Sequence, residues 1–107
     1  MITILFLALA PIFLIFSSPA GTAVINVNCP ADNLQTAIDN AQPGDTISIT
    51  GTCNGNFLVR NDKVRVFIDG NNFAGTINGG VTGTALDIRG KAISVTKITI
   101  NGGNNGI

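Results

Sequence analysis

Few side chains in this sequence could do chemistry, and the most suggestive pair is Asp87 and Arg89 in the stretch ALDIRG. Alternate residues of a β-strand share a face, so both charged groups would point outward from a strand at this position. The pair could bind a sugar that carries a carboxylate. Alternatively, it could be a surface ion pair that contributes little to stability. We favour the surface ion pair, and we expect Arg60 and Arg65 to be solvated charges at strand ends.

Catalytic and metal-dependent chemistry has little support among the remaining residues. His, Trp, Tyr and Glu are absent, which removes the usual proton shuttle at neutral pH and the commonest metal ligand. Asp62, Asp69 and Asp87 stand alone, without the close spacing that a two-carboxylate site or a calcium site requires. We therefore expect no catalytic, cofactor-binding or metal-binding residues in this chain, and whether it belongs to an enzyme stays open.

The charge balance argues against a nucleic-acid partner. Six basic and six acidic side chains give a formal net charge of zero, so no basic field exists to attract a polyanion. The glycine-rich stretch NGGNNG lacks the strand and helix that flank a phosphate-binding loop. A corner of the chain is the simpler interpretation of this stretch.

The first residues are typical of a secretory signal peptide. Residues 2–16 read ITILFLALAPIFLIF and are followed by SSPAGTA, which offers small residues for cleavage after Ala20 or after Ala23. We prefer Ala23, so that residues 1–23 are removed, no membrane span remains, and the protein is secreted or reaches the cell surface. An uncleaved anchor is the alternative, although the apolar run is shorter than the ~20 residues that span a bilayer.

Residues 24–107 would then form one domain whose small core needs a covalent cross-link for stability. Cys29 and Cys53 are the obvious pair in an exported chain. Their disulfide would close a loop of about 25 residues, worth on the order of 3 kcal/mol in the chain-entropy model. The alternative is a pair of buried free thiols.

Ahead of the glycine-rich part of the chain, the pattern predicts one strand and one helix. VINVN, residues 24–28, alternates apolar and polar residues as a strand does. A helix is expected over residues 33–41, where Asp32 and Gln35 have capping-box spacing and Pro43 ends the pattern. Its narrow apolar stripe is formed by Leu34, Ala37, Ile38 and Ala41.

A repeated motif predicts how the rest of the chain is organised. After Asp45 the chain becomes a series of short apolar runs ended by Gly or Asn, and TINGG occurs at residues 76–80 and again 23 residues later. A period in the low twenties with three short strands predicts a solenoid, in which each coil lays its strands on those of the coil before. Ile77 and Ile100 would then be buried neighbours, with Asn78 and Asn101 at one corner.

Two registers are compatible with this pattern. In the first, one face holds residues 46–49, 64–68 and 93–95, a second holds 75–77 and 97–100, and a third holds 57–59, 85–88 and Ile107, with NNFAG or GGVTG forming a longer corner. The competing register stacks Ile49, Ile68 and Ile88. The sequence alone does not decide between them.

The stretch PADNLQTAIDNAQPGDTISITGTCNGNFLV, followed by VRVFIDGN, GTING, TALDIRG and ITINGGNNGI, resembles a known family. It is similar to the amino-terminal cap and first coils of secreted right-handed parallel β-helix proteins of the pectate-lyase-like superfamily. The resemblance covers residues 24–107. It implies an all-β fold, a right-handed parallel β-helix of about three coils with an N-terminal capping α-helix.

That family includes pectate and pectin lyases, polygalacturonases and other enzymes that act on polysaccharides. Its lyases use clustered Asp with calcium and a basic residue, and its hydrolases use paired Asp with His, Arg and Lys, on later coils than those present here. Neither set can be assigned to this sequence. The resemblance therefore implies a fold and a polysaccharide partner, and no catalytic residues.

Two functions remain open at this point. The chain could be an exported fragment of a β-helix protein that binds or processes polysaccharide, or a non-catalytic, adhesin-like surface module. Because nothing caps the coil that ends at Ile107, we expect the chain to be truncated. We also expect end-to-end self-association through the open last coil.

Overall fold

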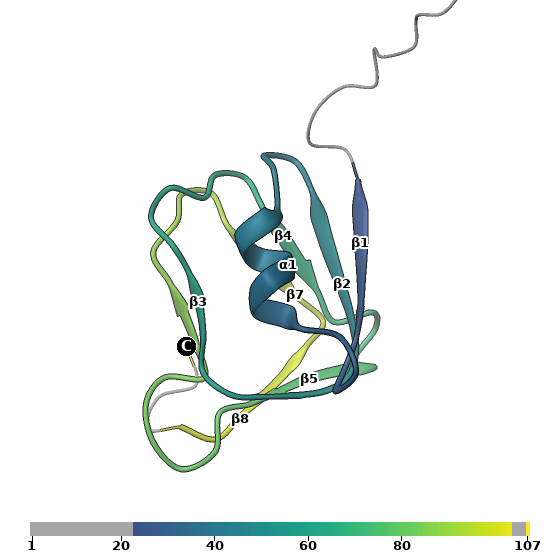
Figure 1. Ribbon diagram of the computed structural model, residues 1–107, viewed down its shortest axis with the longest axis vertical. Coiled ribbons are helices and arrows are strands. Elements are labelled where there is room, and N and C mark those ends of the chain that lie inside the picture. The colour runs from purple at the N-terminus through teal and green to yellow at the C-terminus, as the bar shows by residue number, and fades with distance from the viewer. Residues whose placement is uncertain (1–22, 104–106) are drawn as a thin grey trace, which may run out of the picture.

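Eight parallel strands and one helix make up residues 23–103 and 107, which are the residues that the computed structural model describes (Figure 1). They form a β-solenoid of about three coils, as the sequence predicts. The predicted signal peptide, except Ala23, and residues 104–106 of the predicted NGGNNG corner lie outside the described residues. The elements are β1 (Val24–Asn28), α1 (Leu34–Asn40), β2 (Thr46–Asn54), β3 (Phe57–Val59), β4 (Phe67–Asp69), β5 (Gly75–Asn78), β6 (Leu86–Ile88), β7 (Ser94–Thr96) and β8 (Thr99–Asn101).

The strands lie on three faces, which we call A, B and C. Face A contains β1, the first half of β2, β4 and β7, in that order. Face B contains the second half of β2 with β5 and β8, and face C contains β3 and β6. β2 contributes to two faces because it turns at Gly51, whose φ of 78° is a conformation that glycine adopts without strain. A Cβ at this position would also collide with the carbonyl oxygen of Cys29.

The observed strand pairing confirms the first of the two predicted registers. Ile68 pairs with Ile47 on one side and with Val95 on the other. Ile77 pairs with Ile100 on face B, where Ile77 is fully buried and Ile100, in the last coil, is partly buried. These contacts build the apolar ladders that fill the solenoid.

The competing register is wrong, and one residue of the chosen register is misplaced. Ile88 pairs with Val59, not with Ile68, because β6 follows β3 on face C. Ile107 was expected on the same face, but it belongs to none of the described strands and is 64% exposed.

Both suspected long corners are present, and both lie in the second coil. Residues 70–74 separate β4 from β5, and residues 79–85 separate β5 from β6. The second corner is held by the Asn56 side chain, whose Nδ2 donates to the carbonyl oxygens of Thr82 and Thr84 at 3.2 and 2.9 Å. Together the two corners explain why face C has a longer repeat than face B.

Face B shows that the repeated motif has a third copy. Thr52 pairs with Thr76 and Thr76 with Thr99, while Asn54 pairs with Asn78 and Asn78 with Asn101. The first copy reads TCNG, so Cys53 stands where the later copies have isoleucine. The inward position is apolar in every copy, and the Thr and Asn residues form two outward ladders.

Helix α1 closes the N-terminal end of the solenoid (Figure 1). Leu34 and Ile38 are buried against the core. The predicted capping box is wrong: Asn33 is the N-cap and its side chain accepts from the Thr36 amide at 3.1 Å. The Asp32 carboxylate instead accepts from the amide of Asn28.

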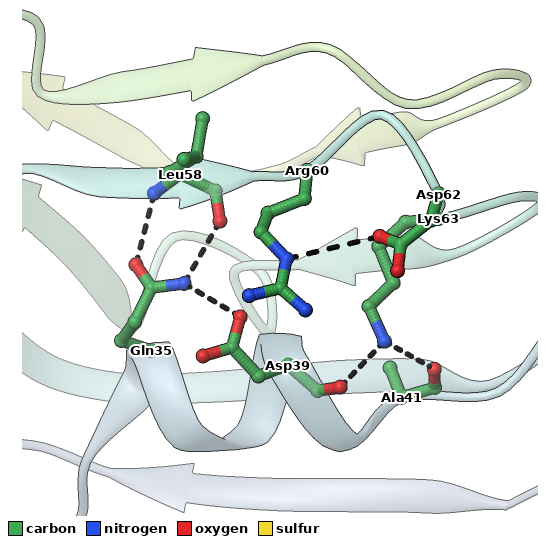
Figure 2. A network of polar contacts seen from close by, with 7 residues as sticks. All are labelled: Gln35, Asp39, Ala41, Leu58, Arg60, Asp62 and Lys63. Atoms are coloured by element: carbon green, nitrogen blue, oxygen red, sulfur yellow. Dashed lines mark hydrogen bonds and ion pairs between the residues drawn. The ribbon is translucent and has the colours of Figure 1, made fainter.

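Gln35 has a different task, which is to pair with the outer edge of β3. Its Nε2 donates to the carbonyl oxygen of Leu58 at 2.8 Å, and its Oε1 accepts from the Leu58 amide at 2.9 Å (Figure 2). The side-chain amide thus replaces the peptide group that a preceding strand would supply. Buried or half-buried backbone groups need such partners.

Lys63 ties the other end of the helix to the same part of the solenoid. Its Nζ donates to the carbonyl oxygens of Asp39 and Ala41, at the C-terminal end of α1 (Figure 2). These carbonyls lack partners within the helix, and a cation is favourable beside them. Gln35 and Lys63 therefore fix the helix to the first coil at both of its ends.

The variant Gln35→Glu is expected to lower the free energy of unfolding by about 1–3 kcal/mol. A carboxylate can still accept from the Leu58 amide, but it cannot donate to the Leu58 carbonyl, and it places a second negative charge beside Asp39. Urea denaturation measures the loss. Thr36→Glu, at the exposed next position of the helix, is the control and should stay within about 0.5 kcal/mol of the parent. Equal losses in the two variants would contradict the edge-pairing role.

Candidate functional site on face C

The outward surface of face C brings together charged residues from two successive coils. Val59 and Leu86 are buried, so their neighbours Leu58, Arg60 and Asp87 project outward. Leu58 pairs with Asp87 and Val59 with Ile88. Arg60 and Arg89 directly follow the pair Val59 and Ile88, so the two arginines occupy matching positions on adjacent coils.

Asp87 and Arg89 form the surface ion pair that the sequence indicates. Arg89 donates from Nε and Nη2 to the same carboxylate oxygen of Asp87, at 3.1 and 2.9 Å. The hydrogen bond and the charge of Asp87 raise the pKa of Arg89 above its ordinary value, so this side chain stays charged. The Arg89 side chain is 63% exposed, and the pair therefore contributes little to stability.

Arg60 is held more loosely than Arg89. Its Nε lies 3.8 Å from the carboxylate of Asp62 (Figure 2), which is too long for a hydrogen bond. Within residues 23–103 and 107, its guanidinium makes no hydrogen bond. Its N–H groups are therefore available to a ligand.

A shallow hollow of about 140 Å³ lies between these residues and is lined by Leu58, Arg60, Asn61 and Arg89. The planar guanidinium group matches the geometry of carboxylates and other oxyanions. The hollow is large enough for one such group or a few waters. We define Arg60, Asn61 and Arg89 as the face C site.

The chain matches none of the protein families, curated proteins or solved structures with which it was compared.

Cys29 and Cys53 form the predicted disulfide, with their Cα atoms 5.0 Å apart. The bridge lines a second hollow of about 380 Å³, between the 29–34 segment and the start of face C, with Phe57 and Asn54 on its other side. Asp32 is the ionisable residue in its lining, and its carboxylate is already bonded to the Asn28 amide. This hollow offers no acid–base pair or nucleophile.

The isolated aspartates do not converge on a shared site. Asp62 lies beside Arg60, Asp87 is paired with Arg89, and Asp69 accepts from the amide of Asn71. Over the described part of the chain, no group of three or more potential metal ligands is found. In the same residues, no helix has the length and apolarity to cross a membrane.

Sequence reasoning missed two residues of the site, Arg60 and its neighbour Asn61. Taken alone, Arg60 resembles any solvated charge at the end of a strand. The signal that could have found it is the pairing of Val59 with Ile88, which carries Arg60 to the side of Arg89. The predicted register put residues 57–59 and 85–88 on one face, but it did not give this pairing, and the two arginines lie just beyond the paired residues.

Proposed function

We propose that this protein is exported and binds an acidic polysaccharide through the face C site. The observation that carries the proposal is the shared hollow of Arg60 and Arg89 on neighbouring coils, where the Arg60 guanidinium and the N–H groups of Arg89 that do not bond Asp87 can meet a ligand. The disulfide is consistent with an oxidising, extracellular environment. The resemblance to the pectate-lyase-like superfamily also supports a polysaccharide ligand.

The arrangement suits a polymer that runs across the strands. Neighbouring strands lie about 4.8 Å apart, so Arg60 and Arg89 would contact carboxylates on the same or adjacent sugar units. Asn61 adds an amide that can donate to and accept from sugar hydroxyls. Leu58 supplies a small apolar surface between the two arginines.

Binding, not chemistry, is the role we assign to these residues. Both arginines are well exposed, with side-chain exposures of 54% and 63%. Contacts of this kind are screened by salt. We therefore propose an interaction that weakens as ionic strength rises, and we place any processing of the polysaccharide outside the face C site.

The double variant Arg60→Gln/Arg89→Gln tests this proposal. We expect its affinity for polygalacturonate to fall by about tenfold or more, because two charge-assisted contacts are lost. Calorimetric titration at low salt, repeated with a neutral glucan, measures the effect.

Arg65→Gln is the matched control, since Arg65 is an exposed arginine outside the hollow. It should bind polygalacturonate about as well as the parent. The proposal fails if the parent does not bind the acidic polymer, or if Arg65→Gln loses as much affinity as the double variant.

A non-catalytic surface module is the second candidate function. The observation that favours it is that β6, β7 and β8 each pair with a single neighbour among the described strands. Strand edges of this kind are sites of pairing with another chain.

A further inference from the structure

Ala23, the residue before β1, takes part in the backbone pairing of the first coil. Its carbonyl oxygen accepts from the Thr46 amide at 3.0 Å, one residue ahead of the register that pairs Val24 with Thr46. Its own amide donates to the Asp45 carboxylate at 3.2 Å. Ala23 therefore extends the contact between β1 and β2 by one residue and belongs to the folded domain.

The Asp45 side chain, which receives the Ala23 amide, is buried with an exposed fraction of 4%. One of its oxygens accepts from Ala23 and the other from the Gln42 amide at 2.8 Å. A buried carboxylate is costly unless donors of this kind satisfy its oxygens. The backbone of Asp45 also joins the first coil to the second, because its carbonyl oxygen accepts from the Phe67 amide at 2.9 Å. Ala23 thus supplies one of two donors to a buried group at a junction of coils.

The two cleavage sites that the sequence offers, after Ala20 and after Ala23, differ in what they do to these contacts. Cleavage after Ala23 would remove the acceptor of the Thr46 amide and one donor of the Asp45 carboxylate. As a protonated amine, the new N-terminus on Val24 could not accept from the Thr46 amide. Cleavage after Ala20 leaves both contacts in place.

We propose that a signal peptidase cleaves between Ala20 and Gly21, so that the mature protein begins at Gly21 and keeps Ala23 in the first coil. Water adds across this peptide bond and leaves a carboxylate on Ala20 and an amino group on Gly21. The inference rests on the export proposed above and replaces the preference for Ala23 that the sequence alone suggested. It is independent of polysaccharide binding.

Expression of the full chain in a secreting host tests the proposal, with N-terminal sequencing and intact-mass analysis of the exported product. We expect the parent product to begin at Gly21. Ala20→Leu puts a large side chain where a small one is needed and should abolish cleavage at this bond. Ala23→Leu is the matched control. The Ala23 side chain is exposed, so this variant should fold and its product should still begin at Gly21.

The outcomes separate this proposal from the others. If Ala20→Leu diverts cleavage to Ala23, the product that begins at Val24 should melt about 4–8 °C or more below the parent product, because the Thr46 and Asp45 contacts are lost. A parent product that begins at Val24, or processing that Ala23→Leu blocks and Ala20→Leu does not, overturns the proposal. A chain that stays uncut inside the cell overturns it together with export. Export with a start at Gly21 supports it whatever the result with polygalacturonate.

Discussion

Replacing Ile77 with aspartate is expected to unfold the protein. Ile77 is fully buried and lies between Cys53 and Ile100 in the ladder of face B. An ionised carboxylate at this position would have no cation or amide donor beside it, since its ladder neighbours are apolar. The cost of burying such a group is at least several kcal/mol, comparable with the whole stability of a small domain, about 5–15 kcal/mol.

Circular dichroism during heating measures this effect, and Thr76→Asp is the matched control. Thr76 precedes Ile77 on the same strand, but it points outward between Thr52 and Thr99 and is half-buried. We expect the control to fold with a loss of about 1 kcal/mol or less. An Ile77→Asp protein that melts within a degree or two of the parent would contradict the inward orientation of this ladder.

The ladder of Ile77 and Ile100 was predictable because identical residues stack on identical residues in a solenoid. Two copies of TINGG were enough to give the period. The third copy was hidden by Cys53, which fills the same apolar position but was considered only as half of a disulfide. A cysteine can serve both purposes, since its side chain is small and apolar.

The contacts that close the first coil could not be predicted in the same way. Gln35 was assigned to a capping box because its spacing from Asp32 fits that motif. In the structure it pairs with Leu58 on face C instead. This contact joins a helix to a strand of a later segment, so no local pattern reports it. The cap itself moved by one residue, to Asn33.

Only part of the face C site could be predicted from the sequence, for a related reason. Asp87 and Arg89 are two residues apart on one strand, so their shared orientation follows from the strand alone. The approach of Arg60 depends on which coil lies beside which. It also depends on the two long corners at residues 70–74 and 79–85, whose lengths no repeat fixed in advance.

Removing the disulfide is the second change for which we expect a large effect. The bridge joins residues that are 24 positions apart, and a loop of this size is worth on the order of 3 kcal/mol. For a domain of 60–100 residues, such a loss lowers the melting temperature by about 10–20 °C. Cys29→Ala, Cys53→Ala and the double variant should all show it, as should the reduced parent.

The three variants also separate the bridge from the packing of Cys53. If the disulfide is the main contribution, the double variant loses about as much stability as Cys53→Ala alone, and the single losses do not add. Cys53 is buried and Cys29 is only partly buried, so Cys53→Ala should cost somewhat more than Cys29→Ala through the space it leaves. Additive losses, or a parent whose melting is unchanged by reduction, would show that the bridge is not a stabilising element.

The same prediction specifies which region opens first when the disulfide is removed. β1 pairs with β2 alone among the described strands, and it leads directly into Cys29, whose amide donates to the carbonyl oxygen of Thr50. Without the bridge, β1 and α1 are tied to the first coil by that strand pairing, by the contacts of Gln35 and Lys63, and by the packing of Leu34 and Ile38. Hydrogen exchange should therefore accelerate most at the amides of β1 and α1 and least at β5, which is paired on both sides. Uniform acceleration over all strands would mean that the bridge stabilises the solenoid as one unit, and that its N-terminal end does not open separately.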